Sequence, residues 1–263
     1  MSGLKNQVFK EELAAFRRIG ICLMATWIGH LRIAENLLSL IDNLDAEQFT
    51  VGNLAPDSGL PDEKWERFDP PPEITHFKDS GEDDAEIQDL RFFDEYLASE
   101  KVRPDVARFS FLLGYFFHLV TDRYWYFEIG KPTMKRYSKQ FEEDSDFIWE
   151  VKRDWYGLDH LYLREHPDSL FFGDFQAYEY RKDYLDFLTA EAIQHRIDEI
   201  RTVYQRDDER IHSLIERPFI FLGKDDMNRF VSNATDHLNG IHQILIVEQR
   251  DYNAARSSLD MLL

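Results

Sequence analysis

Cysteine is almost absent from this sequence of 263 residues, in which Cys22 is the single example. One thiol excludes an intramolecular disulfide and a zinc site built from thiolates. Glycine and proline are scarce as well, with 12 and 9 residues, and most of the prolines lie between residues 54 and 80. Because these two residue types mark turns, their scarcity favours long helices outside that segment.

Positive charge is also in short supply, since 31 lysines and arginines face 50 aspartates and glutamates and the formal net charge is −19. This balance argues against a basic surface for nucleic acid and against unaided binding to an anionic membrane. A phosphate-ester substrate would therefore need another source of attraction, for which bound divalent cations are the obvious candidate.

Long hydrophobic runs are missing too, and no stretch reaches the length of a transmembrane helix. Residues 19–29 are apolar and follow two arginines, but acidic residues precede them and no small-residue cleavage site follows. The apolar pattern instead continues as an amphipathic helix, which is unlike a signal peptide. We therefore expect a soluble, cytoplasmic protein.

Apolar side chains with helical spacing are plentiful: hydrophobic residues make up 43% of the chain, including 21 phenylalanines. No stretch shows the sustained alternation of a strand, so we predict a single all-α domain over residues 1–263. Residues 54–80 form an irregular loop of a length typical of functional segments. The predicted helices cover approximately residues 8–18, 23–43, 46–53, 83–99, 104–128, 131–165 with a possible break near 157, 175–205, 207–216, 224–247 and 251–262.

His118 and Asp122 form the most informative pair, because they lie one helical turn apart in an otherwise apolar segment. A helix places residues four apart on one face, so an imidazole and a carboxylate project side by side from a stripe that should be buried. Burying two such groups is costly unless they pair with each other or bind a metal. From this segment alone both interpretations remain open.

Three further residues extend this pair toward a metal site, namely His30, Asp57 and His76. The five residues together offer three imidazoles and two carboxylates. Such nitrogen and oxygen donors suit zinc, and also manganese or iron. A carboxylate can bridge two cations, and such a pair can activate a water and stabilise the leaving oxygen of a phosphoester.

The order of these motifs resembles that of the zinc-dependent phospholipase C family, which is related to the S1/P1-type nucleases. Its members carry a histidine on an early helix, an aspartate in a motif like APD, a TH dipeptide and a later pattern like G-Y-x-x-H-x-x-x-D. The likeness extends over approximately residues 25–130. The corresponding residues here are His30, Ala55-Pro56-Asp57, Thr75-His76 and Gly114-Tyr115 followed by His118 and Asp122.

This resemblance implies a multi-helix, phospholipase C/P1 nuclease-like bundle that acts as a metal-dependent phosphoesterase. It implies one cation among Asp57, His76, His118 and Asp122, with His30 binding a neighbouring ion that Asp122 bridges. The chain departs from the pattern after Asp122, where family members with three metals have a further histidine that is missing here. We therefore expect one or two ions and a substrate other than bulk phospholipid.

Four other residues are weaker candidates. Glu128 could supply an oxygen in place of the missing histidine. Asp154 and His160 lie on the next predicted helix and could be late ligands or could support a ligand from behind; alternatively, Asp154 pairs with a neighbouring cation on a solvated face. Arg123 matches phosphate geometry and could hold a substrate oxygen, or it could simply offset local acidic charge.

These features favour a hydrolase in which a metal-activated water attacks a phosphate monoester or diester. Asp57 is the candidate catalytic carboxylate, as acceptor of a proton from that water. The alternatives are a metal-binding helical module that has lost turnover and a purely structural helical protein. A phosphohydrolase of the HD class is less favoured, because it needs adjacent His-Asp and this chain has the reverse order at Asp159-His160 and Asp236-His237.

Overall fold

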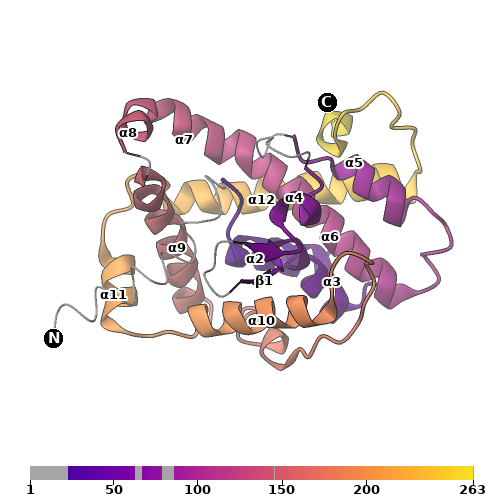
Figure 1. Ribbon diagram of the computed structural model, residues 1–263, viewed down its shortest axis with the longest axis horizontal. Helices are drawn as coiled ribbons and strands as arrows, with labels where there is room; N and C mark the ends of the chain where they lie inside the picture. Colours follow the sequence, from indigo (N-terminus) through magenta and orange to yellow (C-terminus); the bar gives the residue numbers. More distant parts are fainter. Residues whose placement is uncertain (1–22, 63–66, 79–85, 145, 263) are drawn as a thin grey trace.

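The computed structural model describes residues 23–62, 67–78, 86–144 and 146–262, so the helix predicted near residues 8–18 lies outside the described part. The fold is all-α, as predicted (Figure 1). The α-helices are α2 (Trp27–Leu38), α3 (Ala46–Gly52), α4 (Pro72–Thr75), α5 (Asp89–Phe92), α6 (Val106–Trp125), α7 (Lys131–Arg136), α8 (Ser138–Glu143), α9 (Phe147–Glu165), α10 (Ala190–Tyr204), α11 (Glu209–Glu216) and α12 (Lys224–His242). Shorter 3-10 and π turns are η1 (Ala55–Asp57), η3 (Phe93–Leu97), η4 (Tyr126–Gly130), η5 (Asp174–Ala177), η6 (Gln243–Val247) and η7 (Ser258–Leu262).

The proline-rich loop between α3 and α5 is locally ordered where the structure describes it. It contains η1, α4 and one antiparallel ladder between β1 (Leu60–Pro61) and β2 (Phe68–Asp69). This ladder of two residues per strand is all the β structure found in the described ranges, so the prediction of an essentially helical chain needs only this small correction. The described parts of the loop therefore have a defined backbone, and η1 packs against both α4 and α6.

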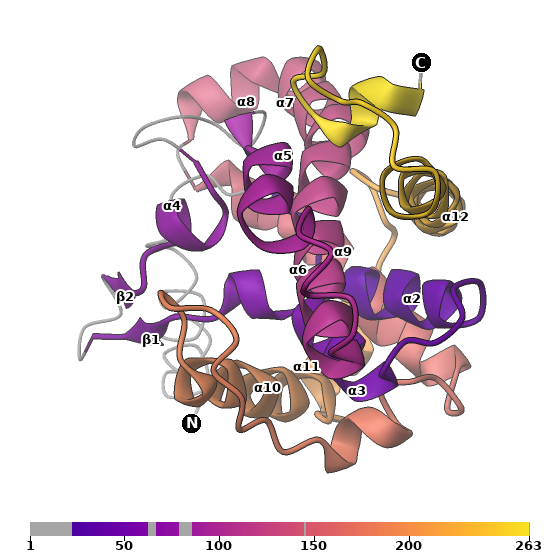
Figure 2. The same ribbon diagram turned by 90° about the vertical axis from the view of Figure 1, so that its right-hand side faces the viewer.

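Helix α6 is the central element, with α2, α3 and α12 packed beside it (Figure 2). The side chain of Asp105 caps its start by accepting a hydrogen bond of 3.1 Å from the backbone N–H of Arg108. Every residue from 110 to 122 is buried, which makes the middle of α6 a core helix rather than an amphipathic surface helix. His118 and Asp122 are consequently held where bulk water does not reach them.

Two glycines allow α3 and α6 to pack with their backbones in direct contact. A Cβ atom at Gly52 would lie 2.2 Å from the carbonyl oxygen of Phe111, and one at Gly114 would lie 2.3 Å from that of Phe49. Both distances are far below van der Waals contact, and the opposing atoms are backbone that cannot rotate away. The close approach places the end of α3 against the face of α6 that carries His118.

The differences from the predicted helices lie mainly in the second half of the chain. The predicted helix over 131–165 is divided into α7, α8 and α9. One break falls at Tyr137, and α8 ends at Glu143 before α9 begins at Phe147, whereas no break occurs near residue 157. The predicted helix over 175–205 begins only at Ala190, where the Thr189 side chain caps it by accepting from the N–H of Ala192. None of the described helices combines the length and apolar composition needed to cross a membrane.

Substitution of Gly114 by alanine tests this close packing. The added methyl would push α3 away from α6, and we expect the free energy of unfolding to fall by about 2 kcal/mol, as for other overpacked core sites. Urea denaturation followed by circular dichroism measures the loss. Gly240→Ala is the matched control, because Gly240 also lies inside a long helix but its new Cβ would meet only the flexible side chain of Leu262, at 3.1 Å. Equal stability of the two variants would contradict the packing argument.

Candidate metal centre

The structure brings together all five residues of the main sequence motif. His30 comes from α2, Asp57 from the end of η1, His76 from the residue that ends α4, and the remaining pair from α6. In each case the local structure orients the side chain inward, and all four segments meet beside the buried middle of α6. The five residues are His30, Asp57, His76, His118 and Asp122, of which all but Asp57 are at most 1% exposed.

Hydrogen bonds to backbone carbonyls orient two of the imidazoles. His118 Nδ1 lies 2.8 Å from the carbonyl oxygen of Asn53, and His76 Nδ1 lies 3.2 Å from that of Pro72. A carbonyl oxygen can only accept, so His118 Nδ1 carries the proton and its Nε2 presents a lone pair when the ring is neutral. His76 Nδ1 also lies 3.0 Å from the Thr75 hydroxyl, and the tautomer that donates to Pro72 leaves the lone pair on Nε2. The hydroxyl of Tyr115 on α6 also donates to the carbonyl of Thr75 at 2.5 Å, which anchors the loop that carries His76.

These two Nε2 atoms face two carboxylate oxygens. His118 Nε2 lies 3.0 Å from Asp122 Oδ2 and 3.9 Å from Asp57 Oδ1, and His76 Nε2 lies 3.5 and 3.4 Å from the same two oxygens. The two nitrogens are themselves 3.4 Å apart. Although Asp122 Oδ2 is buried, it receives no well-formed hydrogen bond from any described group. Two imidazole nitrogens and two carboxylate oxygens thus converge as potential ligands.

Five of the six spacings among these four atoms are close to those of a tetrahedral site. With metal–ligand bonds of about 2.1 Å, tetrahedral ligands are separated by about 3.4 Å. The five distances given above span 3.0–3.9 Å and bracket that value. Two neutral imidazoles and two carboxylates are also a donor set that zinc accepts. A self-satisfied His–Asp pair, the other interpretation of the α6 motif, does not explain why a second imidazole and a second carboxylate converge on the same point.

His30 lies on the other side of Asp122. Its Nε2 is 3.2 Å from Asp122 Oδ1, and its ring stacks on that of His118 with centroids 3.9 Å apart. The backbone N–H of Ala25 donates to the same oxygen at 2.9 Å. Asp122 Oδ1 is therefore held by two groups while Oδ2 is directed into the cluster. Within the described ranges, the residues that could hold an ion form two groups that share His118: one adds His30 and Asp122, and the other adds Asp57 and His76.

Charge explains the pKa shifts in this cluster. Burial disfavours the ionised carboxylate, but the imidazoles of His118 and His76 outweigh it and hold the pKa of Asp57 at about 2. Burial also disfavours a protonated imidazole at His76, yet hydrogen bonds to Asp122 and Asp57 raise its pKa to about 9. In the metal-free protein a proton on His76 therefore neutralises part of the charge that a cation would neutralise.

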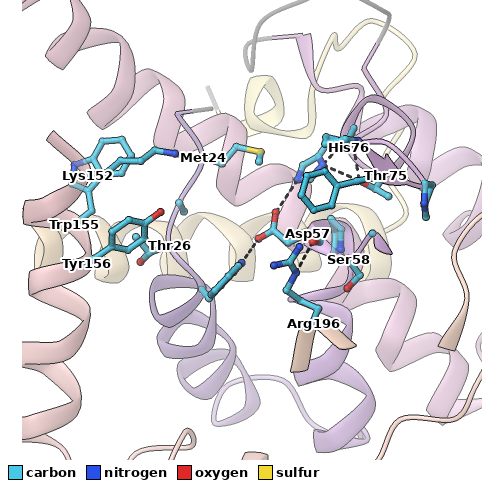
Figure 3. A pocket seen from close by; sticks show the side chains of 17 residues that line it. Met24, Thr26, Asp57, Ser58, Thr75, His76, Lys152, Trp155, Tyr156 and Arg196 are labelled. Atoms are coloured by element: carbon cyan, nitrogen blue, oxygen red, sulfur yellow. Dashed lines mark hydrogen bonds and ion pairs between the residues drawn. The ribbon is translucent and has the colours of Figure 1, made fainter. Parts of the chain in front are cut away.

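Two of the five residues form the floor of a pocket that opens to solvent (Figure 3). Asp57 and His76 line it, whereas the other three residues lie buried behind them. The pocket is open on one side, and its empty space of about 820 Å³ includes solvent at its mouth. The other lining residues are mainly apolar, with two cations: Met24, Ala25, Thr26, Trp27, Pro56, Ser58, Gly59, Phe68, Pro70, Pro72, Thr75, Lys152, Trp155, Tyr156 and Arg196.

Asp154 and Glu128 do not join the cluster. The carboxylate of Asp154 is fully buried but forms an ion pair with Arg217 and accepts 2.6 Å hydrogen bonds from the backbone N–H groups of Ile220 and Phe221. Its carboxylate therefore contacts none of the five cluster residues, as a ligand or as a support, and it is not paired on a solvated face as the third alternative from the sequence had it. Glu128 is exposed on η4 and belongs to neither of the two groups of described residues that could hold an ion.

His160 and Arg123 also lie apart from the cluster. His160 packs against the ring of Tyr204 with centroids 5.0 Å apart, and burial together with the nearby charge of Arg206 lowers its pKa to about 4. The guanidinium of Arg123 donates to the carbonyl of Ile87 at 3.1 Å and does not line the pocket. The pocket cations are Lys152 and Arg196 instead; they lie far from the motif residues in sequence, and no local pattern marks them.

Comparison with known proteins identifies no relative. No protein-family model matches the chain, and no curated protein or solved structure matches it either. The chemistry of this centre therefore rests on its own geometry.

The raised pKa of His76 predicts a pH-dependent affinity for zinc. Below pH 9 a proton must leave His76 before its Nε2 can bind a cation, so the apparent association constant should rise about tenfold per pH unit between pH 7 and 9. Titration calorimetry in buffers of different ionisation enthalpy measures the released proton directly, and we expect close to one proton per zinc at pH 7.5. An affinity that stays constant over this range would contradict the assignment of His76 as a ligand.

Asp154 gives a prediction that separates stability from metal binding. Asp154→Ala removes the partner of Arg217 and of two backbone N–H groups, so we expect the free energy of unfolding to fall by about 3 kcal/mol. Zinc affinity should be unchanged once the measurement is made well below the melting temperature. A variant of normal stability that has lost zinc would show instead that Asp154 serves the metal.

Proposed function

We propose that this protein is a metal-dependent hydrolase of phosphate esters, related to the zinc-dependent phospholipase C family. The observation that carries the proposal is the convergence of two imidazole lone pairs and two carboxylate oxygens at the floor of an open pocket. The order of the sequence motifs and the all-α fold are consistent with that relationship. The cation is a divalent one of the zinc type, with manganese or iron as the other candidates.

The residues of the cluster divide the work of holding this cation. His76 and His118 supply neutral nitrogen donors whose orientation is set by backbone carbonyls. Asp57 and Asp122 supply two negative charges that balance a divalent ion in a buried place. When bound, such a cation supplies Lewis acidity and lowers the pKa of water in the site.

The pocket residues favour a small, anionic substrate. The pocket walls carry aromatic side chains, among them Phe68 and Tyr156, against which an apolar part of a substrate can pack. Lys152 brings positive charge to the wall of this pocket in a protein whose net charge is −19, whereas the charge of Arg196 is paired with Glu199. A phosphate group entering the pocket meets Asp57 and His76, so its reacting atoms lie at the one open side of the cluster.

The role proposed for Asp57 differs from the one expected from the sequence. A carboxylate with a pKa of about 2 is a weak proton acceptor, because it holds its negative charge throughout the physiological range. Asp57 is therefore better suited to act as an anionic ligand that faces the substrate than as the general base. It remains the one carboxylate of the cluster that lines the pocket and can touch the reacting groups.

Metal analysis and hydrolysis assays test this proposal together. We expect the purified protein to carry about one zinc per chain and to hydrolyse 4-nitrophenyl phosphate or bis(4-nitrophenyl) phosphate in the presence of zinc or manganese. Loss of an outer partner of a ligand alone costs about 10- to 100-fold in metal affinity, so His118→Ala, which removes a ligand, should lose at least about 100-fold in zinc affinity and in hydrolysis.

His242→Ala is the control, because His242 is also a buried histidine at the end of a long helix but lies outside the cluster. It should keep both the zinc and the activity of the parent protein. Zinc bound at the parent level without hydrolysis of either ester would favour the metal-binding module that lacks turnover. A protein that binds neither zinc nor manganese would overturn the proposal.

A further inference from the structure

The two carboxylates of the cluster are held in different ways, and the difference points to residues outside the motif. Asp122 is fixed through Oδ1 by the backbone of Ala25 and by His30. Asp57 is fixed instead through Oδ2, which accepts a hydrogen bond of 2.8 Å from the indole Nε1–H of Trp27. This bond leaves Oδ1 of Asp57 facing the two histidine Nε2 atoms, at 3.4 and 3.9 Å.

Arg196 supports this arrangement from α10. Its Nε–H donates to the backbone carbonyl of Asp57 at 2.7 Å, as the dashed line in Figure 3 indicates. Its guanidinium also lies over the ring of Trp27, 5.0 Å from the ring centroid, and forms an ion pair with Glu199. Arg196 is only 6% exposed, and Glu199 offsets part of the cost of burying its charge. One side chain thus fixes both the main chain of Asp57 and the indole that holds its carboxylate.

The hydrogen bond from Trp27 to Asp57 affects how many protein atoms can bind the proposed cation. Four protein atoms already suffice for a closed tetrahedral zinc site, and catalysis needs a further position for water or substrate. A freely rotating Asp57 could offer its second oxygen and occupy that position. Because Trp27 engages Oδ2, Asp57 can offer only Oδ1, and the side of the cluster that faces the pocket stays open.

We propose that Trp27 and Arg196 are positioning residues that hold Asp57 as a one-oxygen ligand and so keep a coordination position open toward the pocket. This inference depends on the proposed function, since it requires that the cluster bind a cation. It concerns side chains from α2 and α10 that donate no atom to the cation themselves. Their effect is expected on the geometry of the bound ion as well as on its affinity.

Zinc affinity and cobalt spectra of three variants test the inference. Trp27→Phe keeps an aromatic ring but loses the N–H, and we expect it to weaken zinc binding about 10- to 100-fold, as for other outer partners of ligands. Arg196→Lys keeps the charge for Glu199 but cannot both donate to Asp57 and stack on the indole, and we expect a loss of about 10-fold. Competition with a chromophoric chelator measures both values.

Trp155→Phe is the matched control. Trp155 lines the same pocket, and its Nε1 has no hydrogen-bond partner among the described residues, so the substitution removes the same atoms without removing a hydrogen bond to a ligand. Its zinc affinity should equal that of the parent protein. Thermal unfolding of each metal-free variant establishes that it folds.

Cobalt(II) gives the readout that a merely structural role would not change. The intensity of its visible absorption falls as the coordination number rises, so release of Asp57 Oδ2 in Trp27→Phe should weaken the spectrum relative to the parent protein and to Trp155→Phe. An unchanged affinity and spectrum in Trp27→Phe would overturn the inference for Trp27, and a parent-like Arg196→Lys would overturn it for Arg196. If the parent protein binds no cation at all, the proposed function fails first, so the two failures are distinguishable.

Discussion

The backbone contact between α3 and α6 is the constraint on which the centre depends. Gly52 and Gly114 let the two helices approach until a side chain at either position would collide with the opposite main chain. That approach brings the carbonyl of Asn53, the residue after α3, within 2.8 Å of His118 Nδ1. The carbonyl fixes the protonated nitrogen of the ring, and the lone pair of Nε2 is thereby directed at Asp122 and Asp57. The close packing of α3 on α6 thus determines which ring nitrogen of His118 carries the proton.

Burial makes the electrostatic energy of this arrangement unfavourable unless a positive charge is present. Two carboxylates and two imidazole lone pairs placed at 3.0–3.9 Å would be costly in a site that excludes water unless positive charge enters among them. In the metal-free protein a proton on His76 supplies part of that charge, which is why the pKa of this residue rises to about 9. The divalent cation proposed for this site would supply all of it, and the low dielectric of the buried cluster would strengthen its attraction to the carboxylates.

The pocket and the support around Asp57 come from a different part of the fold. Helix α9 contributes the aromatic wall, and α10 contributes the guanidinium behind Asp57. Of the five cluster residues, Asp57 and His76 line this pocket and can contact a ligand in it. His30, His118 and Asp122 lie buried behind them. The proposed hydrolase and the proposed positioning role both follow from this division.

The sequence predicted the parts of this protein that depend on local spacing. Apolar periodicity predicted the all-α class and helices such as α3 and α11, and the four-residue spacing of His118 and Asp122 on an apolar helix predicted that they share a buried face. The sequence also suggested that Asp154, His160 and Arg123 belong to the site, which they do not. Asp154 pairs with Arg217, His160 packs on Tyr204, and Arg123 donates to the carbonyl of Ile87. Ile87 is 36 residues from Arg123 and Arg217 is 63 residues from Asp154, and no periodic pattern in the sequence extends over such separations.

What the sequence determined by itself is therefore the helical class, the buried pair on α6 and the set of side chains able to bind a metal. The tertiary structure alone decided which nitrogen of each histidine faces inward, that Trp27 and Arg196 hold Asp57, and which edge of the cluster opens to solvent. The physical reason is that these features depend on backbone carbonyls and on side chains up to 139 residues apart. A carbonyl has no signature in the sequence, and the meeting of distant segments is fixed only when the helices pack.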